Sequence, residues 1–506
     1  MKLKNTARMI TLLMALIFLL SVATGCKKDQ PEEQDSDVAT ESTAGSNTSD
    51  VTEDTDSLYD ENGYLKDTVP ELDFDGYNFK MLGWISGYDS DFYAEVDVGD
   101  TIVDAVYYRN EAIKERLNVG LSASLIDGNN ASQSQFMTAA TNAIMAGGIS
   151  EFDLIGSYSM CGGTLATQGL VCDLNTLDYL DFDKPWWSKS LLEMSTVNNE
   201  LYFVTGDLSN AYLYNLYCLI VNKNLITTYH LDDPRAMVKN GTWTLDIMIE
   251  MTKQAGSDDD DTPGKTEGDH YGYVSYGNVH MDCFLAASGI RMAEENSDGI
   301  IQLTEDFTGN RMHSLITKVN DWLHNGDECV LSQEFGYKNI KNGNALFGAV
   351  AFSTVKTFQE ATWDYALLPY PKVYDTQDSY YTNLGFGYTN FSIPITVNDP
   401  DMSAAVLECM NSEAHRTSTP VLYEKVLKSR YSQEALDKEM YDVIRENVYV
   451  DANRIFSSSF VWSDSAVALF RNSIINNNSN WLSTISGKKD GINGILATIS
   501  TSITGS

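Results

Sequence analysis

The sequence lacks the short motifs by which several classes of enzyme are recognised. It contains no GxSxG nucleophile elbow, no HExxH zinc motif and no GxGxxG dinucleotide fingerprint. Gly264-Lys265-Thr266 ends like a phosphate-binding loop, but Asp259 stands where the first glycine of that loop is needed. A carboxylate there would repel phosphate, so we predict no nucleotide site. Paired carboxylates for glycoside hydrolysis stay open as an alternative, because the sequence does not give their separation in space.

Basic residues, cysteine and histidine are also scarce. The 506 residues include 34 Lys and Arg against 71 Asp and Glu, which gives a formal net charge of −37. So strong an acidic balance argues against binding to nucleic acid or to anionic lipid. The 7 cysteines show no CxxC spacing and the 6 histidines match no ligand spacing, so we expect no metal and no cofactor. We interpret the cysteines in apolar patterns, most clearly Cys218 and Cys409, as buried hydrophobic residues.

The N-terminal residues 1–25 have the pattern of a secretory signal peptide. A basic segment that includes Lys2 precedes an apolar run too short for a comfortable membrane span. The run ends at Gly25-Cys26 and resembles a bacterial lipobox, although Ala23 stands where leucine is usual. We therefore expect lipidation of Cys26, including palmitate, and a protein anchored to the extracellular face of the bacterial cytoplasmic membrane. A plain signal peptide with an incidental cysteine is the alternative.

Residues 26–65 are predicted to form an acidic, disordered tether. The stretch from Asp29 to Asp60 is rich in Asp, Glu, Ser and Thr and contains no Lys or Arg. Such a segment cannot bury enough apolar surface to offset its chain entropy, and its like charges extend it. Roughly 440 residues remain after it, which is enough for two domains with substantial cores.

The stretch from Asn210 to Gly256 is the most informative part of the rest of the chain. From Asn210 onwards both alternating faces are largely apolar, which predicts a strand that is buried on two sides and ends at Asn222-Lys223. A helix is predicted next, because Thr244 can act as its N-cap and Gly256 as its stop. Three residues of the strand are predicted to lie in the core, namely Leu213, Leu219 and Val221.

Strands alternate with helices before that stretch. Tyr77–Leu82 and Phe152–Gly156 have the pattern of strands, and Asp100 can cap a helix between them. This alternation predicts an α/β lobe with a mainly parallel sheet, in which ligands bind beyond the carboxyl ends of the strands. The loop from Trp84 to Tyr88 and the residues Ser157-Tyr158 would then lie at a binding edge.

Further along the chain, several segments follow one another in the order seen in a known protein family, and the chain resembles that family. Asn342–Pro371 contains a strand rich in small residues, Gly385–Pro394 resembles a second crossing between two lobes, and Asp399 can cap a helix that Pro400 opens. Together with the strand into Asn222-Lys223, these segments resemble the extracellular solute-binding proteins of bacterial ABC transporters. The resemblance is specifically to family 1, the sugar-binding group related to maltose-binding protein, and it covers roughly residues 60 to 460.

The resemblance implies a fold and partners. The implied fold is the two-lobed periplasmic-binding-protein (Venus-flytrap) fold of the α/β class, type II-like, with discontinuous lobes around mixed sheets and a hinge that closes on ligand. Trp243 and Trp363 occupy structural positions of the family pattern and are expected in the core. An ABC permease and a separate ATPase are the implied partners of a monomer. The expected lobes are 70–212 plus 387–450 for lobe 1, and 213–386 plus 451–506 for lobe 2.

The resemblance also implies a carbohydrate ligand, with an oligosaccharide favoured and a peptide or polyamine left open. Aromatic rings suit the C–H face of a sugar, and neighbouring polar groups pair with its hydroxyls. The rival functions are a lipid-anchored surface hydrolase, and a sensory or adhesion protein on the same fold. Ligand contacts are expected at loops and lobe crossings, at Trp84, Tyr88, Ser157, Tyr158, Asp207, Tyr214, Phe352, Tyr388 and Trp462.

Overall fold

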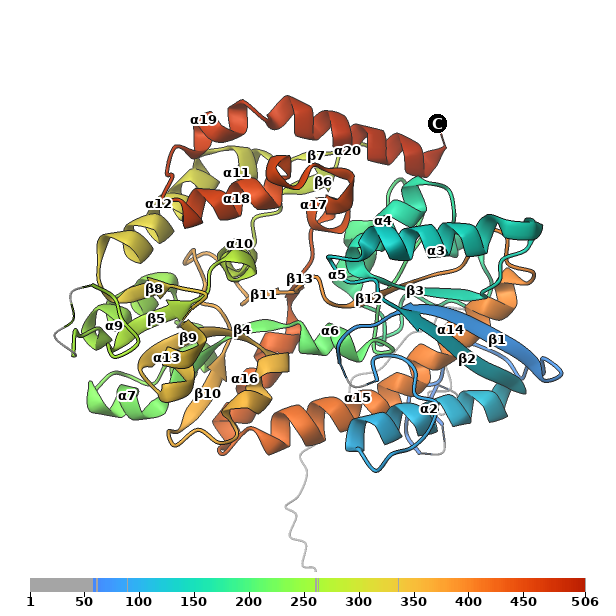
Figure 1. The fold of residues 1–506 in the computed structure, drawn as a ribbon, viewed down its shortest axis with the longest axis horizontal. Helices are drawn as coiled ribbons and strands as arrows, with labels where there is room; N and C mark the ends of the chain where they lie inside the picture. The colour runs from blue at the N-terminus through green and yellow to red at the C-terminus, as the bar shows by residue number, and fades with distance from the viewer. Residues whose placement is uncertain are drawn as a thin grey trace, which may run out of the picture. The chain divides into compact units, whose positions relative to one another are not determined.

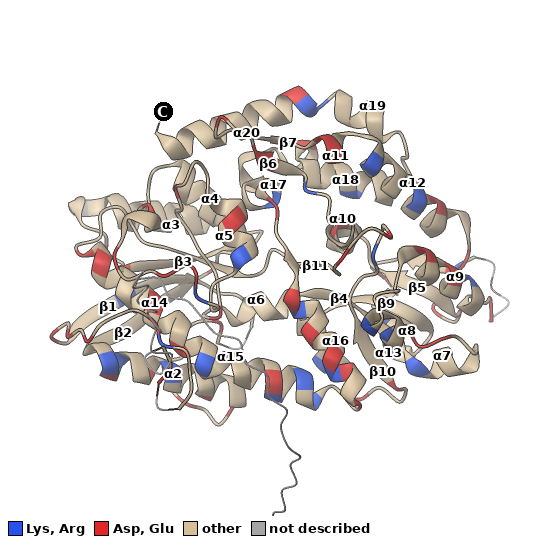
Figure 2. Cartoon of the chain, turned by 180° about the vertical axis from the view of Figure 1, so that it is seen from behind, with Lys and Arg blue, Asp and Glu red and all other residues tan. Residues whose placement is uncertain are grey.

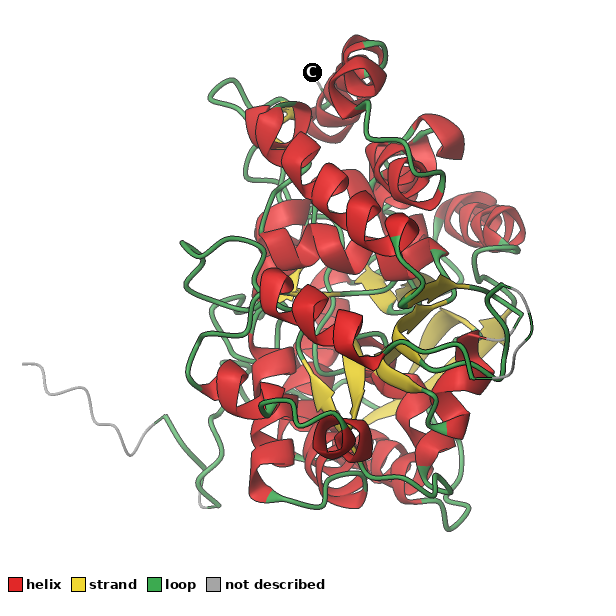
Figure 3. Cartoon of the chain, turned by 90° about the vertical axis from the view of Figure 1, so that its left-hand side faces the viewer, coloured by secondary structure: helices red, strands yellow, loops and turns green. Residues whose placement is uncertain are grey.

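The computed structural model describes residues 58–505 except 61, 89, 260, 261, 263 and 335. The predicted signal peptide, Cys26 and most of the predicted tether lie outside the described residues. Residues 58–506 form one compact unit. Its strands lie inside, and helices and loops surround them (Figure 3). No helix in the described part of the chain combines the length and the hydropathy needed to cross a bilayer.

Four strands form the first sheet, in the order β12-β3-β1-β2. The strands β1, β2 and β3 pair in parallel, whereas β12 runs antiparallel to β3. Helices connect the parallel strands, and α2 and α14 pack against one another beside this sheet (Figure 1). The predicted α/β class is confirmed here. The bounds are β1 Tyr77–Trp84, α2 Thr101–Leu117, β2 Val119–Ile126, α3 Gln133–Met145, β3 Leu154–Tyr158, α4 Ser159–Thr167, β12 Thr389–Ser392 and α14 Pro400–Arg416.

Five strands form the second sheet, in the order β10-β4-β9-β5-β8. The strand β4 is antiparallel to β9 and β10, whereas β5 is parallel to β9 and β8. All residues of β5 and β9 are buried, and neither strand has a charged side chain (Figure 2). The bounds are β4 Tyr217–Asn222, α7 Lys223–Thr228, α8 Pro234–Lys239, α9 Leu245–Ala255, β5 Tyr271–Ser275, α12 Asn310–Asn325, β8 Cys329–Leu331, α13 Gly336–Asn342, β9 Ala345–Ala351, β10 Tyr365–Leu368 and α16 Ala435–Glu446.

The remaining elements join and cover the two sheets. The helix α18 packs on α12, and α20 packs on β7 and also contacts α4. The bounds of the helices and strands are α5 Lys189–Ser195, α6 Asn210–Tyr214, α10 Asp282–Ser288, β6 Ala293–Glu295, β7 Ile301–Leu303, α11 Glu305–Thr308, β11 Thr382–Asn383, α15 Ser418–Pro420, β13 Val448–Tyr449, α17 Ala452–Ile455, α18 Ala466–Ile475, α19 Trp481–Ser486 and α20 Lys489–Thr504. The short 3₁₀ turns and one π-helix are η2 Ala146–Gly148, η3 Leu174–Thr176, η4 Asn278–Met281, η5 Phe352–Phe358, η6 Val421–Lys428, η7 Ser457–Ser459 and η8 Trp462–Asp464.

The segment that crosses between the sheets differs from its prediction. We expected one strand from Asn210, but the chain forms α6 first and begins β4 only at Tyr217. The N–H of Asn215 donates to the carbonyl of Ala211 at 3.1 Å and closes a helical turn. The carboxylate of Asp91, far away in the sequence, accepts the N–H of Ala211 at 2.8 Å. Apolar alternation over so few residues does not separate a buried helix from a buried strand, so this tertiary contact decides.

Three predicted helix starts are confirmed. The side chains of Asp100, Thr244 and Asp399 each accept a backbone N–H from the first turn of α2, α9 and α14. Pro400 occupies the first position of α14, where its missing N–H is not needed. These starts depend on residues that are neighbours in the sequence, which is why local patterns predict them.

The predicted core residues are buried. The ring of Trp243 lies 5.6 Å from that of Phe347 on β9, beneath α9. Cys218 and Cys409 are buried as predicted, and the described cysteines are unpaired. Within the described residues, no group of His, Cys, Asp or Glu could hold a metal ion. The predicted core residues found buried are Trp243, Trp363, Leu213, Leu219 and Val221.

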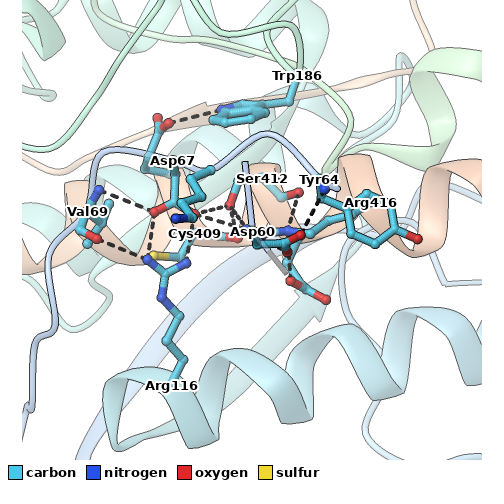
Figure 4. Close-up of polar contacts among 12 residues, drawn as sticks. Asp60, Tyr64, Asp67, Val69, Arg116, Trp186, Cys409, Ser412 and Arg416 are labelled. Carbon is cyan, nitrogen blue, oxygen red and sulfur yellow. Dashed lines mark hydrogen bonds and ion pairs between the residues drawn. The ribbon is translucent and has the colours of Figure 1, made fainter. Parts of the chain in front are cut away.

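Asp67 ties the first described segment of the chain to α2 and α14 (Figure 4). Arg116 of α2 donates two hydrogen bonds to its carboxylate, at 2.7 and 2.6 Å. Arg416 and Ser412 of α14 donate to the same carboxylate, at 3.1 and 2.6 Å. We call these four residues the Asp67 cluster. Burial alone would raise the pKa of Asp67, but the hydrogen bonds from Arg116 and Ser412 and the two positive charges lower it to about 2.

Two segments pack differently from the expected domain boundaries. Residues 58–60 and 62–65, which we expected in the tether, pack as a turn in which Asp60 accepts the N–H of Tyr64 at 2.8 Å. The helix α16, which we expected in lobe 1, packs on β10 and α8 of the second sheet. Asp437 of α16 pairs there with Arg235 of α8 at 2.5 Å. Both differences depend on contacts between residues distant in sequence. The other lobe boundaries stay predictions.

Candidate binding site

A cavity of ≈ 570 Å³ lies where segments connected to both sheets meet. This volume is in the range of small-molecule sites. Its walls come from the end of β3, the turn between α6 and β4, η4, the connection before β12, η7, η8 and α18. The lining residues are Asn130, Gln133, Tyr158, Met160, Asn215, Tyr217, Asn278, Val279, Phe386, Gly387, Ser457, Ser458, Phe460, Trp462 and Arg471.

Two other cavities have a similar size. One of ≈ 630 Å³ is lined mainly by the helices α9 and α12, which both pack against strands of the second sheet. The other, of ≈ 650 Å³, lies between β8, η4 and α18 and shares Asn278 with the first cavity. We place the candidate site in the cavity of ≈ 570 Å³, because it joins residues from both sheets and combines aromatic rings with a buried guanidinium.

Tyr158 lies at the carboxyl end of β3 and lines the cavity. Its ring meets that of Trp84 edge to face, with 5.0 Å between the centroids. Trp84 is only 3% exposed, and its indole N–H donates to the hydroxyl of Thr389 at 2.8 Å. Trp84 therefore supports Tyr158 from behind. The parallel register of β1 and β3 explains the pairing, because it aligns the carboxyl ends of both strands.

The buried carboxylate of Asp91 holds several segments together behind Tyr158 and Trp84. Its carboxylate accepts hydrogen bonds from the hydroxyls of Thr389 and Ser209 and from the N–H of Ala211. Burial raises the pKa of Asp91, and these three donors and the charge of Arg109 oppose that shift. The same carboxylate thus links β12, which carries Thr389, to the start of α6.

The turn after α6 brings an amide and a pair of tyrosines to the cavity edge. The Asn215 amide donates to the carbonyl of Gly387 at 2.7 Å and to that of Ala211 at 2.8 Å, and it lies 3.0 Å from the hydroxyl of Tyr88. Tyr88 and Tyr214 stack with 4.9 Å between their centroids. A Cβ at Gly387 would come within 2.8 Å of the Asn215 side chain, so this close approach requires glycine.

A buried carboxylate with two arginines forms the opposite wall. Asp282 accepts Nε and Nη2 of Arg471 at 2.5 and 2.6 Å, and it also accepts Nη1 of Arg454. Arg454 donates a further hydrogen bond to the carbonyl of Leu384 at 2.7 Å, and Arg471 donates to Asn278 at 3.1 Å. We call Asp282, Arg454 and Arg471 the Asp282 cluster. It joins α10, α17 and α18 at the cavity.

Two aromatic rings cover the Asp282 cluster. The guanidinium of Arg454 lies 4.2 Å from the ring centre of Phe386, and that of Arg471 lies 5.0 Å from that of Trp462. Trp462 remains 42% exposed. Cation–π contacts of this kind are stronger where water is excluded, so they hold both rings against the charged groups. The result is an aromatic surface with positive charge directly behind it.

Tyr217 lines the side of the cavity next to the second sheet, and His280 packs against its ring. Tyr217 begins β4, and its ring lies 5.6 Å from that of His280. His280 is paired with the hydroxyl of Ser275 at 3.0 Å. Burial lowers the pKa of His280 to about 3, so this imidazole is neutral at pH 7. Burial also raises the pKa of the Tyr217 phenol.

The structure brings five of the nine expected contact residues together. Tyr158 and Trp462 line the cavity. Tyr88 and Tyr214 stack next to Asn215, which lines it, and Trp84 lies directly behind Tyr158. Ligand contact by these residues stays a prediction.

The other four residues do not line the cavity. Ser157 and Tyr388 are buried beside the cavity, and Tyr388 is 5% exposed. Phe352 is 1% exposed and packs 5.1 Å from Tyr441 of α16, because η5 turns its ring inward. Asp207 lines a different cavity of ≈ 300 Å³, where it pairs with His415 at 2.5 Å.

Sequence reasoning missed most of the residues that line the cavity. Asn215 and Tyr217 lie within the crossing segment, and Phe386 lies between two glycines of the second crossing, so their position in those motifs was the available signal. Arg471 had no such signal, because it stands in the middle of α18, a helix whose residues are mostly buried. Its position against Asp282 becomes visible only in three dimensions.

Comparison with known proteins identifies the fold. No family model matches the sequence, and no curated protein does. An ABC substrate-binding protein from Listeria monocytogenes in complex with cycloalternan matches with a TM-score of 0.51 and 14% identity, over 83% of this chain and 99% of that one. The chain has the fold of the sugar-binding proteins of ABC transporters.

Two further structures agree with this conclusion. The cyclic alpha-maltosyl-1,6-maltose binding protein from Arthrobacter globiformis has a TM-score of 0.53, 12% identity and coverage of 83% and 99%. A family 1 extracellular solute-binding protein from Bifidobacterium longum subsp. infantis has a TM-score of 0.52, 12% identity and coverage of 84% and 100%. The predicted two-lobed α/β fold is thereby confirmed. At this level of identity the likeness shows the fold alone.

Proposed function

We propose that the protein captures a carbohydrate, preferably an oligosaccharide, in the cavity of ≈ 570 Å³ and delivers it to an ABC permease. The observation that supports this most directly is the lining of the cavity. Trp462, Tyr158 and Tyr217 offer aromatic faces for the C–H side of a sugar ring. The amides of Asn130, Gln133 and other lining residues offer donors and acceptors for its hydroxyls.

Two of the structural neighbours bind saccharides by their own description, which agrees with this ligand class. One was solved with cycloalternan, and another binds cyclic alpha-maltosyl-1,6-maltose. The described residues that line the cavity include no Asp or Glu. A hydrolase would need two carboxylates about 5–10 Å apart on either side of the bond that it cleaves, so binding without turnover is the better-supported function.

The lining also suggests how binding could be coupled to a change of conformation. Tyr158 follows the first sheet, whereas Tyr217 begins a strand of the second sheet. A ligand that contacts both residues binds best when they are close together, and only this difference in affinity can drive closure. Scattering with and without ligand should then show compaction.

Calorimetry with a panel of oligosaccharides tests the proposal. Trp462→Ala should weaken binding of the best ligand by about five- to a hundred-fold, which corresponds to the loss of about 1–3 kcal/mol from one well-packed ring. Tyr108→Ala is the matched control, because Tyr108 is a 58% exposed aromatic residue on α2 that does not line the cavity. Equal affinities for both variants would place the site elsewhere. Release of reducing ends that survives repurification would favour the hydrolase.

Attachment to the membrane and delivery to a permease form the second half of the proposal. The N-terminal pattern ending at Gly25-Cys26 supports lipid anchoring at the extracellular face of the cytoplasmic membrane. Cys26→Ser should release the protein into the medium, whereas equal release of wild type and variant would contradict the anchor. Deletion of the gene should abolish uptake of the ligand. Normal uptake with intact binding would favour the sensory or adhesion function.

A further inference from the structure

The candidate cavity has a charge of the opposite sign to the whole protein. The chain has a formal net charge of −37, yet Arg471 is the one charged residue among the described residues that line the cavity. Its side chain is only 8% exposed. Burial of a charge that is not fully compensated is unfavourable, so this charge at a binding cavity indicates a ligand that pairs with it.

The Asp282 cluster leaves one positive charge uncompensated. It contains the guanidinium groups of Arg454 and Arg471 and the single carboxylate of Asp282. The neighbouring His280 is neutral at pH 7, because burial lowers its pKa to about 3. The phenol of Tyr217 contributes no negative charge, because burial raises its pKa. Two positive charges and one negative charge therefore give this wall a net charge of +1.

The next acid inside the protein does not supply the missing charge. Asp451 accepts the N–H of Met292 at 2.6 Å and the hydroxyl of Tyr449 at 3.1 Å. Burial raises the pKa of Asp451, and within the described residues its carboxylate forms no ion pair with Arg454 or Arg471, which both pair with Asp282. The excess positive charge therefore remains at the cavity wall.

Arg471 keeps donors for a ligand. Its hydrogen bonds to Asp282 and Asn278 use Nε, Nη2 and Nη1 once each. A guanidinium has five N–H groups, so one N–H on each terminal nitrogen is not used by these bonds. A planar fork of this kind matches a carboxylate better than it matches a hydroxyl. Trp462, whose ring centre lies 5.0 Å from the guanidinium, provides a surface for the sugar ring beside it.

We propose that the ligand is an acidic saccharide that contains a uronic acid, with its carboxylate bound by Arg471 and its ring packed on Trp462. This inference rests on the proposed function and narrows it to one class of carbohydrate. A neutral sugar would leave the positive charge of the Asp282 cluster without a counter-charge as the cavity loses water. A polyamine would add repulsion.

Oligomers of uronic acids and their methyl esters test the inference, because an ester keeps the shape of the sugar and removes its charge. The probes are galacturonate, guluronate and glucuronoxylan oligomers, each with its own ester, together with neutral and sulfated oligosaccharides. For at least one pair, calorimetry should show binding of the acid about ten- to a hundred-fold tighter than that of the ester, as expected for a charge-assisted hydrogen bond. Rising salt should weaken binding of the acid and leave that of the ester nearly unchanged.

A pair of Arg471 variants separates the charge from the fold. Arg471→Gln leaves Asp282 paired with Arg454 and should remove the preference for acid over ester, while Arg471→Lys should keep part of it. The salt dependence of acid and ester binding by the wild-type protein tests the same charge interaction without a variant. Neutral sugars or esters that bind as tightly as the acids would overturn this inference and leave the proposed function intact. A preference for sulfated sugars would overturn the assignment of a carboxylate, and no binding of any saccharide would overturn both proposals.

Discussion

The Asp67 cluster and the Asp282 cluster both place one carboxylate between two arginines, but only in the first does an arginine also pair with further carboxylates. Arg416 of the Asp67 cluster also lies 3.8 Å from Asp60 (Figure 4). It pairs in addition with Glu413 at 3.1 Å. In the Asp282 cluster no second carboxylate forms an ion pair with either arginine in the described part of the chain. This difference in the number of paired carboxylates reflects where each cluster lies in the fold.

The Asp67 cluster fastens the first described segment to α2 and α14, whereas the Asp282 cluster forms part of a cavity wall. Side-chain exposure separates them as well, since Arg116 is 34% exposed and Arg454 is 6% exposed. Water and nearby acids can satisfy the arginines around Asp67 if one contact is lost. The arginines around Asp282 have no such replacement, so the same arrangement should respond more strongly to substitution there.

Asp282→Asn should have the largest effect on stability. It leaves two buried guanidinium groups without their carboxylate, which costs about 3–5 kcal/mol in comparable buried pairs. Urea unfolding at pH 7 measures the loss. Asp464→Asn is the matched control, because Asp464 pairs with Lys488 at 2.8 Å but its side chain is 50% exposed. This control should change the unfolding free energy by less than about 1 kcal/mol.

The same variant sharpens the argument about the ligand. With Asp282 neutral, the wall would hold two positive charges, so the folded fraction should prefer acidic over esterified saccharides more strongly than the wild type does. A loss of stability no greater than that of Asp464→Asn would contradict the idea that the Asp282 cluster is dry and poorly compensated.

Glu408→Gln tests a buried carboxyl near the Asp67 cluster that forms no ion pair with an arginine among the described residues. Glu408 accepts the indole N–H of Trp186 at 3.1 Å and the N–H of Asp181 at 3.3 Å. Burial raises the pKa of Glu408 to about 8, and the charge of Asp67 adds to the shift. The folded state therefore binds more protons than the unfolded state between pH 4.5 and about 8, so its stability falls as pH rises through this window.

Urea unfolding at several pH values measures this effect. Between pH 5 and pH 8 the wild-type protein should lose about 3 kcal/mol more stability than Glu408→Gln, which does not titrate. A constant difference between the two proteins across this range would show that Glu408 is ionised in the folded state. Because the comparison uses differences between pH values, any constant effect of the new amide cancels.

Asp67→Asn should have the smallest effect of the three, and the opposite dependence on pH. Since the pKa of Asp67 is lowered from 3.8 to about 2, this carboxylate stabilises the folded protein above pH 3.8 and loses that contribution as pH falls through 2. The variant should lose about 2 kcal/mol at pH 7, and the difference should shrink in acid. A loss that does not depend on pH would point to packing rather than charge.

Local sequence patterns were sufficient for the parts of the fold that depend on neighbouring residues. Asp100, Thr244 and Asp399 were recognised as helix caps because a cap bonds to N–H groups only two or three positions further along the chain. The strands β1 and β3 were found for a similar reason, since a run of apolar residues fixes the strand itself. The alternation of such elements predicted an α/β lobe, and the family resemblance implied the two-lobed fold.

Contacts between distant residues decided what these patterns left open. Asp91 turned the start of the crossing segment into α6, although the run of apolar residues fitted a strand equally well. The packing of η5 buried Phe352 against Tyr441, and pairing with His415 held Asp207 at another cavity. Each of these outcomes depends on a partner more than 80 positions away in the sequence.

The sequence by itself determined the charge of the chain, three helix caps and the apolar runs of β1 and β3, because these follow from composition and from contacts between near neighbours in the chain. Only the tertiary structure placed Arg471 and Arg454 on the same carboxylate of Asp282, more than 170 positions away in the chain. Charge balance is a property of groups that are close in space. An excess of one positive charge can therefore arise at the cavity of a strongly acidic chain without any trace in its composition.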